Sequence, residues 1–272
     1  MSANSFKYLM QDMSEPEGFQ LMGGTLAVYS ARSPGKLTDN EDAAAVLPCG
    51  DDCGVLIVAD GMGGGAVGEQ ASRIAVESIK SEVDQQIDGD DTILRSAILN
   101  GLESGNQEIL DLGVGAATTI AAVEIQGHLI RPYHVGDSSI LVVGQRGKIK
   151  LQTVAHSPVS LAVEAGILDD AEAMHHEDRH LVTNMLGTPD MRIEIGSTIQ
   201  LSRFDTVLLA TDGLFDNMAI EEVVERIRKG PLLQGLEQVI EVTASRMENS
   251  EDGVPSKPDD LTIIAFRLNS PA

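Results

Sequence analysis

The residues best placed to do chemistry in this sequence are carboxylates that interrupt apolar runs. Asp60 ends the run VLIVAD, and Asp212 ends the run VLLATD. Each precedes a glycine, and Asp-Gly is ordinary tight-turn chemistry, so one such site would mean little. The same placement recurs at five sites along the chain, which together contain Glu41, Asp42, Asp60, Asp137, Asp212 and Asp259.

Carboxylates gathered at strand ends would form an oxygen-rich pocket, and so many repelling anions are tolerated only around cations. Oxygen ligands without clustered Cys or His favour magnesium or manganese over zinc or copper. Two such ions that share one Asp create a bridging water of lowered pKa, which can attack phosphorus in line. The pattern therefore predicts hydrolysis of a phosphate ester. Gly61 supports it, because a residue without Cβ lets the backbone turn sharply and bring its carbonyl near an ion.

Composition narrows the classes of partner. The chain has 272 residues, 42% of them hydrophobic, so it can bury a sizeable core. Aromatic residues make up 3%, which leaves few platforms for stacking bases, and a formal net charge of −23 would repel nucleic acid and anionic lipid. We expect neither a nucleic-acid nor a membrane partner. The acidity fits a solvated surface, or carboxylates that hold cations, or both.

The N-terminal stretch MSANSFKYLMQDMSEPEGF lacks a basic segment followed by an apolar core, and no apolar run approaches membrane-spanning length. We therefore expect a cytoplasmic protein. Cys49 and Cys53, the only cysteines, lack the second pair that a tetrahedral zinc site needs. Two reduced thiols beside a turn are the favoured interpretation, and a local disulfide is the alternative in an oxidising setting.

Short strand-like segments outnumber helical ones, which predicts an α+β fold. Helical spacing of apolar residues occurs over Ala71–Ile79, Ile93–Leu102, Ile220–Ile227 and Leu236–Met247. Strands are expected at Thr25–Ser30, Gly54–Ala59, Ala117–Ile125, His128–His134, Ser139–Val143, Lys148–Val154, Thr206–Ala210 and Leu261–Leu268. The short turns between the strands from Ala117 to Val154 indicate an antiparallel meander.

The chain shows no internal repeat and no low-complexity linker. We expect one domain over residues 23–272, preceded by a segment, 1–22, that is a candidate for flexibility. Residues 249–257 form a second polar run with Pro and Gly, which favours disorder. Residues 155–195 lack a clear period and hold four of the six histidines. A loop of that length in a compact domain is often functional.

The chain resembles the metal-dependent serine/threonine phosphatases of the phosphatase 2C (PPM) family, in its prokaryotic form. The resemblance covers the chain from about Gly24 to Leu268, and its motifs stand in the family's order. They are NED at Asn40–Asp42, ADGMGG at Ala59–Gly64, GAATTIAAV at Gly115–Val123, HVGDS at His134–Ser138, HSPVSLAVEAGIL at His156–Leu168, TNMLG at Thr183–Gly187, LLATDGLFD at Leu208–Asp216 and DDLTIIAF at Asp259–Phe266.

The resemblance implies a four-layer αββα sandwich, in which two antiparallel sheets are flanked by helices, with a binuclear magnesium or manganese centre at one end. It implies that residues 155–195 form the family's flap. It also implies ligand roles. Asp60 bridges both ions, Asp212 and Asp259 complete one, and Glu41 with the Gly61 carbonyl serves the other. Asp42 orients that side or ligates through water, and Asp137 helps Asp212 hold a weaker third ion.

Four positions depart from the family pattern. Members commonly have an Arg shortly before the Asn-Glu-Asp stretch that binds the substrate phosphate, whereas the nearest cations here are Arg32 and Lys36. Either could bind phosphate, and a surface role is the alternative for each. Met62 stands where many eukaryotic members have a His, so no general acid is assigned. Ser139 replaces an Arg, and Asp260 replaces an Asn and adds a charge.

The histidines are expected to be structural or solvated. His128 and His134 lie on apolar strands, where a satisfied structural histidine is commoner than a ligand. His156 opens the flap segment and would orient it. The stretch MHHEDRH, which contains His175, His176 and His180, could pass for a metal cluster. A solvated loop is the favoured interpretation, with substrate contact second.

We expect an enzyme that hydrolyses phosphoserine and phosphothreonine by attack of a water that bridges two divalent ions. Its partners would be phosphorylated proteins, in opposition to a serine/threonine kinase, and it would act as a monomer. The alternative is a catalytically weak regulatory or phospho-binding module on the same fold, motivated by the missing Arg. Hydrolysis of a phosphorylated small molecule is a related alternative that the same metals would support.

Overall fold

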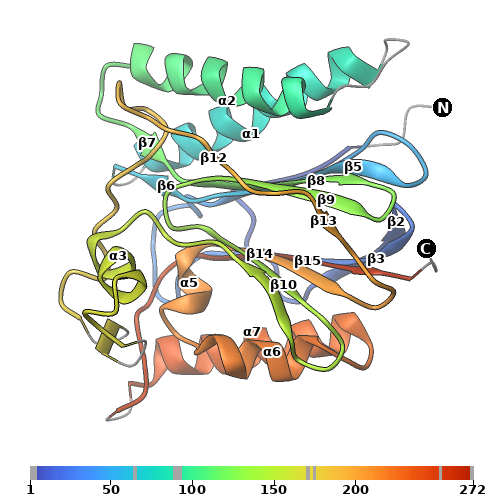
Figure 1. The fold of residues 1–272 in the computed structure, drawn as a ribbon. Coiled ribbons are helices and arrows are strands. Elements are labelled where there is room, and N and C mark those ends of the chain that lie inside the picture. The colour runs from blue at the N-terminus through green and yellow to red at the C-terminus, as the bar shows by residue number, and fades with distance from the viewer. Residues whose placement is uncertain are drawn as a thin grey trace.

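Two antiparallel β-sheets face each other and are covered on their outer sides by helices (Figure 1). The computed structural model describes residues 5–63, 66–87, 94–169, 172–173, 176–250 and 253–269. The arrangement confirms the predicted α+β, four-layer αββα sandwich. Ile93, part of one predicted helix face, lies outside the described residues.

The first sheet packs under the helix pair at the top of Figure 1. Its strand order is β1-β4-β5-β8-β9-β12, and β13 also pairs with β9. The bounds are β1 Phe6–Leu9, β4 Ala43–Pro48, β5 Cys53–Ala59, β8 Ile120–Gln126, β9 Leu129–Val135, β12 Glu194–Ile195 and β13 Ile199–Gln200.

The second sheet has the order β11-β10-β14-β15-β3-β2. A small separate pair, β6 with β7, follows β5 and precedes β8 in the chain. The bounds are β2 Glu17–Leu21, β3 Gly24–Ala31, β6 Gly61–Met62, β7 Ala117–Thr118, β10 Ser139–Val143, β11 Ile149–Gln152, β14 Thr206–Ala210 and β15 Leu261–Leu268.

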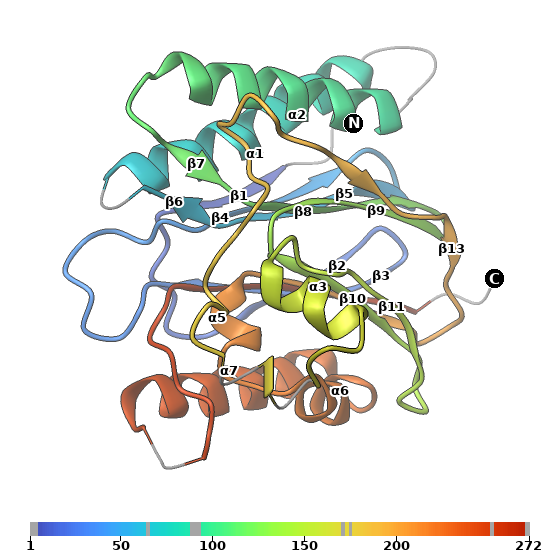
Figure 2. The same ribbon diagram turned by 60° about the vertical axis from the view of Figure 1, so that its left-hand side comes forward.

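The helices form the two outer layers and part of the flap. Figure 2 shows α1 and α2 over the first sheet, α6 and α7 under the second, and α3 beside α5. The bounds are α1 Ala66–Ile87, α2 Leu94–Asp111, α3 Pro158–Glu164, α5 Asp212–Phe215, α6 Ile220–Ile227 and α7 Leu232–Glu248. Among the described residues, no helix combines the length and apolar character needed to cross a bilayer.

The central strands are buried on both faces, because each sheet packs on the other sheet inside and on helices outside. Every residue of β15, for example, is buried. Between the sheets, the core contains side chains such as Leu26, Leu56 and Phe266. Burial of both faces explains why these strands read as continuous apolar runs rather than as alternating patterns.

The sequence pattern identifies the central strands and misses some others. The predicted bounds of β10, β14 and β15 agree with the structure. Strand β4 is missed because its first half is Ala43–Ala45, and alanine is uncommon in strands. Packing on both faces holds it there, since all of β4 is buried.

Residues 1–22, expected as a separate and flexible segment, contain β1 and β2 in their described part. Strand β1 pairs with β4, and β2 pairs with β3. Tyr8 is buried, and the rings of Phe6 and Phe19 lie 4.8 Å apart between their centroids. These contacts attach the segment to one edge of each sheet.

Cys49 and Cys53 form a disulfide across the turn between β4 and β5. The favoured expectation of two reduced thiols is therefore not what the structure has. The reason is the register of the hairpin, which brings the two Cα atoms to 5.4 Å, within the usual range for a disulfide.

Candidate metal centre

The predicted carboxylates meet at one end of the sandwich because of strand register. Ala43 pairs with Ala59, so the flanking residues Asp42 and Asp60 lie side by side. In the second sheet Ser139 pairs with Ala210, and Ala210 pairs with Ile263. Asp137, Asp212 and Asp259, which lie just outside these pairs in the chain, therefore reach the same end.

The backbone of Asp60 is fixed by the motif GAATT. The Thr118 hydroxyl donates to the Asp60 carbonyl at 2.7 Å, and the Thr119 amide donates to the same carbonyl at 2.9 Å. The Thr119 hydroxyl also lies 2.6 Å from the Ser138 hydroxyl, which follows Asp137. These contacts join the loops that carry Asp60 and Asp137.

Gly61 lies where only a glycine fits. A Cβ at this position would meet the Gly68 carbonyl at 2.1 Å and the Glu41 carbonyl at 2.7 Å. Gly68, at the start of α1, is under a matching constraint, because its Cβ would meet Glu41 Oε1 at 2.5 Å. The Asp60-Gly61 turn, the first turn of α1 and the Glu41 loop therefore pack backbone to backbone.

Four carboxylate oxygens of the cluster are buried without a hydrogen-bond donor among the described residues. Asp42 shows the pattern, since its Oδ2 accepts from the Thr211 hydroxyl at 2.9 Å while its Oδ1 has no partner. A buried, unpartnered acceptor is costly unless a cation or water satisfies it. An all-oxygen donor set fits magnesium or manganese. The four atoms are Glu41 Oε1, Asp42 Oδ1, Asp137 Oδ1 and Asp212 Oδ1.

Burial and mutual repulsion raise the pKa of several cluster carboxyls above the ordinary Asp value. Burial raises the pKa of Asp60 most, and the charges of Asp212 and Asp42 add to it. Burial and Asp212 raise the pKa of Asp137 to about 7. The pKa values of Asp42 and Asp259 are raised too, again first by burial. Each shift has the direction expected for buried carboxylates that repel one another, and a bound cation would oppose it.

One side of the cluster is held by Lys257, which the sequence analysis did not single out. Its ammonium lies 2.7 Å from Asp212 Oδ2, 2.6 Å from Asp216 Oδ2 and 3.0 Å from Asp259 Oδ2. Burial lowers its pKa, but the three carboxylates outweigh burial and raise it. The Lys257 amide donates to Asn217 Oδ1 at 2.8 Å, so this end of the run expected to be disordered is anchored.

The other side is held by Lys36 and Asp260. The Lys36 ammonium lies 2.7 Å from Glu41 Oε2 and 2.6 Å from Asp260 Oδ2. The Asp260 carboxylate also accepts from the amides of Ser33 and Glu41, each at 2.7 Å. The charge that Asp260 adds thus ties residues 33–41 to the start of β15. Arg32 is directed elsewhere, and pairs with Asp12 at 2.9 Å on the surface.

A signal for Lys257 did exist in the sequence, since the residue stands two positions before Asp259 in the stretch KPDD. Asp216 likewise lies within the stretch LLATDGLFD, four residues after Asp212. A lysine within a polar run reads as solvated, however. Only the path of residues 253–259 back toward α5 brings it to three carboxylates.

His134, His156 and Glu194 lie together at the base of the flap, but their hydrogen bonds do not suit a metal. His156 Nδ1 accepts from the backbone amide of Gly136 and lies 2.9 Å from the side-chain Nδ2 of Asn184. Its Nε2 must then carry the proton and donate to Glu194, at 3.2 Å. A ligating histidine binds the metal through one unprotonated ring nitrogen, Nδ1 or Nε2, that accepts from no other donor, whereas both ring nitrogens of His156 are engaged. The three side chains instead bind the flap to β9 and β12.

The remaining flap histidines show no convergence on the cluster. His175 lies outside the described residues. His176 accepts from the Asp178 amide within its own turn, and His180 is exposed. The solvated-loop interpretation suits both described residues.

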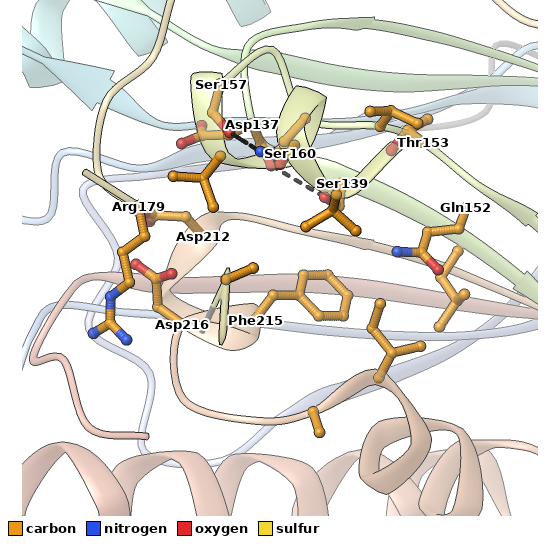
Figure 3. A pocket seen from close by; sticks show the side chains of 18 of the residues that line it. Asp137, Ser139, Gln152, Thr153, Ser157, Ser160, Arg179, Asp212, Phe215 and Asp216 are labelled. Carbon is orange, nitrogen blue, oxygen red and sulfur yellow. Dashed lines mark hydrogen bonds between the residues drawn. The ribbon is translucent and has the colours of Figure 1, made fainter. Parts of the chain in front are cut away.

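A cavity of about 710 Å³ opens beside the carboxylate cluster. Asp137, Asp212 and Asp216 line one side of it, and Figure 3 shows the Phe215 ring between these carboxylates and Gln152. The flap contributes α3 and Arg179. A cavity of this size can take part of a substrate.

Comparison with known proteins agrees with this geometry. A family described as Protein phosphatase 2C matches residues 35–250. The chain is 30% identical over 223 residues to Protein phosphatase PhpP of Streptococcus pneumoniae. The aligned region covers 79% of this chain and 86% of that protein.

Solved structures share the fold. The S. agalactiae serine/threonine phosphatase has a TM-score of 0.76 at 26% sequence identity. The matched region covers 90% of this chain and 99% of that protein's chain. The catalytic domain of the serine/threonine protein phosphatase PstP, solved in complex with two manganese ions, has a TM-score of 0.70 at 24% identity, and covers 90% of this chain and 98% of its own.

Proposed function

Because this chain belongs to the protein phosphatase 2C family and is a serine/threonine protein phosphatase, we propose that it works with two manganese or magnesium ions held by the carboxylate cluster. The observation that carries the proposal is the set of four buried carboxylate oxygens at one end of the sandwich that have no donor in the described part of the chain. The two manganese ions of the related PstP catalytic domain support it.

The ligand roles follow the position of each residue. Asp60 would contact both ions, Asp212 and Asp259 would complete one, and Glu41 with the Gly61 carbonyl would complete the other. Asp42, whose Oδ2 is fixed by Thr211, would orient the second ion or hold it through water. Asp137 and Asp212 would hold a third ion. When bound, such ions supply a water of lowered pKa as the nucleophile for phosphate ester hydrolysis.

The protein's own residues prepare this end of the sandwich in three ways. Thr118 and Thr119 fix the Asp60 backbone, which sets the position from which its side chain extends. Asp260 holds the loop that carries Glu41. Lys36 is the candidate to bind the substrate phosphate because it contacts Glu41 of the cluster, whereas Arg32 pairs with Asp12 on the surface. Asp60 and Asp212 are the residues on which turnover depends.

A cysteine nucleophile does not suit the geometry. Cys53 begins β5 and Asp60 directly follows its end, so the cysteine turn lies at the opposite end of the first sheet. Cys49 and Cys53 are also joined to each other. We propose direct hydrolysis without a phosphoenzyme.

We further propose that residues 23–272, together with strands β1 and β2 that complete the two sheets, act as one catalytic domain, with residues 155–195 as a flap over the site. The substrates are phosphorylated proteins, in opposition to a serine/threonine kinase, and the chain acts as a monomer. Support for the flap is its position, because α3 and Arg179 line the cavity beside the cluster.

The test is hydrolysis of a phosphothreonine peptide by the purified chain with manganese, with magnesium and with a chelator. We expect metal-dependent phosphate release, and a loss of at least about a hundredfold in kcat for Asp212→Asn. Circular dichroism of the variant checks that the fold is kept.

Manganese binding is measured separately by calorimetry. No release of phosphate from a chain that binds manganese would contradict catalysis and leave a regulatory or phospho-binding module. Full activity of both Asp212→Asn and Asp60→Asn would contradict the assignment of the site.

A further inference from the structure

The cavity beside the carboxylate cluster continues away from it, between α3, the β10–β11 hairpin and the start of α6. We infer that this part binds a bulky apolar side chain of the phosphorylated protein, close in sequence to the phosphorylated residue. The inference rests on the proposed function, because it takes the cluster as the place where the phosphate binds.

The first argument is continuity. Asp137, Asp212 and Asp216 line the same cavity as the apolar residues of α3 and α6. A phosphopeptide whose phosphate lies at the cluster therefore has the cavity directly beside it. The volume of about 710 Å³ exceeds what one side chain needs, so part of the peptide backbone can enter as well.

The second argument is the nature of the walls away from the cluster. Four apolar residues line the cavity, namely Ile149 on β11, Val163 on α3, Phe215 on α5 and Ile220 on α6. None of these four is buried in the core, and Ile149 is 38% exposed. Apolar surface that faces water in a concave site is stabilised when an apolar group covers it.

The third argument is that key polar groups in the walls are already used. The Thr153 hydroxyl accepts from the Ile140 amide at 2.9 Å. The Ser157 hydroxyl accepts from the Ser160 amide at 3.0 Å and caps α3, and the Ser139 hydroxyl donates to the Asp137 carbonyl at 3.1 Å. A polar substrate side chain would gain little from these groups in exchange for its water.

The fourth argument is charge. Glu164 and Glu221 line the cavity as well as Asp216, and these carboxylates outnumber Arg179, the cation among the described lining residues. The whole chain carries a formal net charge of −23. An acidic substrate residue would enter a region of like charge, so it should be rejected more strongly than a neutral polar one. We therefore expect the cavity to bind an apolar substrate side chain best, a neutral polar side chain less well and an acidic side chain least.

The experiment uses sets of phosphothreonine peptides. Each set varies one position near the phosphothreonine and places Leu, Asn or Asp there. In at least one set we expect kcat/KM with manganese to be at least about tenfold higher for the Leu peptide than for the Asn peptide, mainly through KM, and lowest for the Asp peptide. Turnover of 4-nitrophenyl phosphate, which has no residue next to a phosphorylated residue, serves as the internal reference.

Two variants on α3 locate the effect. Val163→Asp places a charge in the cavity and should reduce kcat/KM for the Leu peptide to the level of the Asn peptide, with 4-nitrophenyl phosphate turnover within about twofold of the parent. Leu161→Asp is the matched control, because Leu161 is 55% exposed on the same helix and does not line the cavity. If Val163→Asp loses the helical signal, Val163→Phe fills the cavity instead and should lower the same preference.

The outcomes are distinct. Equal kcat/KM for Leu and Asn peptides at every position, in an enzyme that hydrolyses 4-nitrophenyl phosphate, would overturn the inference and leave the proposed function standing. A full Leu preference in both Val163 variants would overturn it too. If manganese binds but neither substrate turns over, the proposed function fails. Fluorescence anisotropy with labelled peptides, in which a non-hydrolysable phosphonate replaces the phosphate ester, then tests the Leu preference by binding alone.

Discussion

Single residues in this site act mainly through charge. Among the described residues, four carboxylate oxygens at the end of the sandwich lack donors, and two lysines provide much of the local charge compensation. Lys257 contacts Asp212, Asp216 and Asp259, and Lys36 contacts Glu41 and Asp260. Both lysines bind oxygens of residues that would also hold a divalent ion. Substitution of either should therefore have one effect without metal and another with it.

Lys257→Met should lower the melting temperature in chelator by several degrees, because three partly buried carboxylates lose their cation. The same change should tighten manganese binding, since no ammonium then competes for Asp212. Differential scanning calorimetry and titration calorimetry measure the two effects. Lys80→Met, which removes a pair with Asp84 on α1, is the control and should leave manganese affinity unchanged. Unchanged values of both quantities in Lys257→Met would contradict this role.

Lys36→Ala should raise KM for a phosphothreonine peptide by about tenfold, because a charge-assisted contact to phosphate is lost. Arg32→Ala should leave KM unchanged, since Arg32 is paired with Asp12 at the surface. Steady-state kinetics with saturating manganese makes the comparison. The opposite order of effects would assign phosphate binding to Arg32.

At the scale of elements, the ends of strands position the site and the outer helices brace it. Strand β14 runs directly into α5, which begins at Asp212, and α6 and α7 pack below. Arg246 on α7 donates to both carboxylate oxygens of Glu222 on α6, each at 2.8 Å, and to the Asn217 carbonyl at 2.7 Å. This clamp joins the two helices to the loop that holds Lys257.

Glu222→Gln should destabilise the protein by about 0.5–1 kcal/mol at neutral pH, since the pair is partly exposed. Hydrogen bonds from Arg246 lower the pKa of Glu222 in the folded state. The contribution is therefore complete above the ordinary Glu pKa, and it is lost as the pH falls through the lower folded value.

The melting temperatures of parent and variant should thus differ at pH 7 and converge in acid. Thermal melts followed by circular dichroism across this range provide the measurement. Glu225→Gln, which affects an exposed pair within α6, should have a smaller effect. A difference that grows in acid would contradict the assigned sign.

For the molecule as a whole, the acidic balance and the cluster act together. The chain has 42 acidic and 19 basic residues, and buried acidic groups such as Asp42 and Asp260 lie at one end of the sandwich. General repulsion among surface charges is screened by any salt. Binding of a divalent ion by the cluster would instead be specific, so the two contributions can be separated by experiment.

Manganese should raise the melting temperature by about 5–10 °C at a concentration near a hundred times its dissociation constant, because ligand binding stabilises only the folded state. Sodium chloride at the same ionic strength should give a much smaller rise. Asp60→Asn should lose most of the manganese effect and keep the salt effect. Equal shifts from the two salts in the parent protein would contradict a specific site.

The sequence by itself determined the α+β class, the central strands and the carboxylates at their ends. It could do so because buried strands are continuous apolar runs, and a charged residue at such a boundary is conspicuous. Asp60 and Asp212 are visible for this reason alone.

Only the tertiary structure decided which groups surround those carboxylates. Strand β4 is alanine-rich and is held by packing, the Cys49–Cys53 bond depends on hairpin register, and Arg32 and Lys36 have similar local signals but different partners. Lys257 sits in a polar run that reads as solvated. Its three ion pairs depend on long-range contacts between α5, α7 and the start of β15, and no local pattern records contacts between segments far apart in the chain.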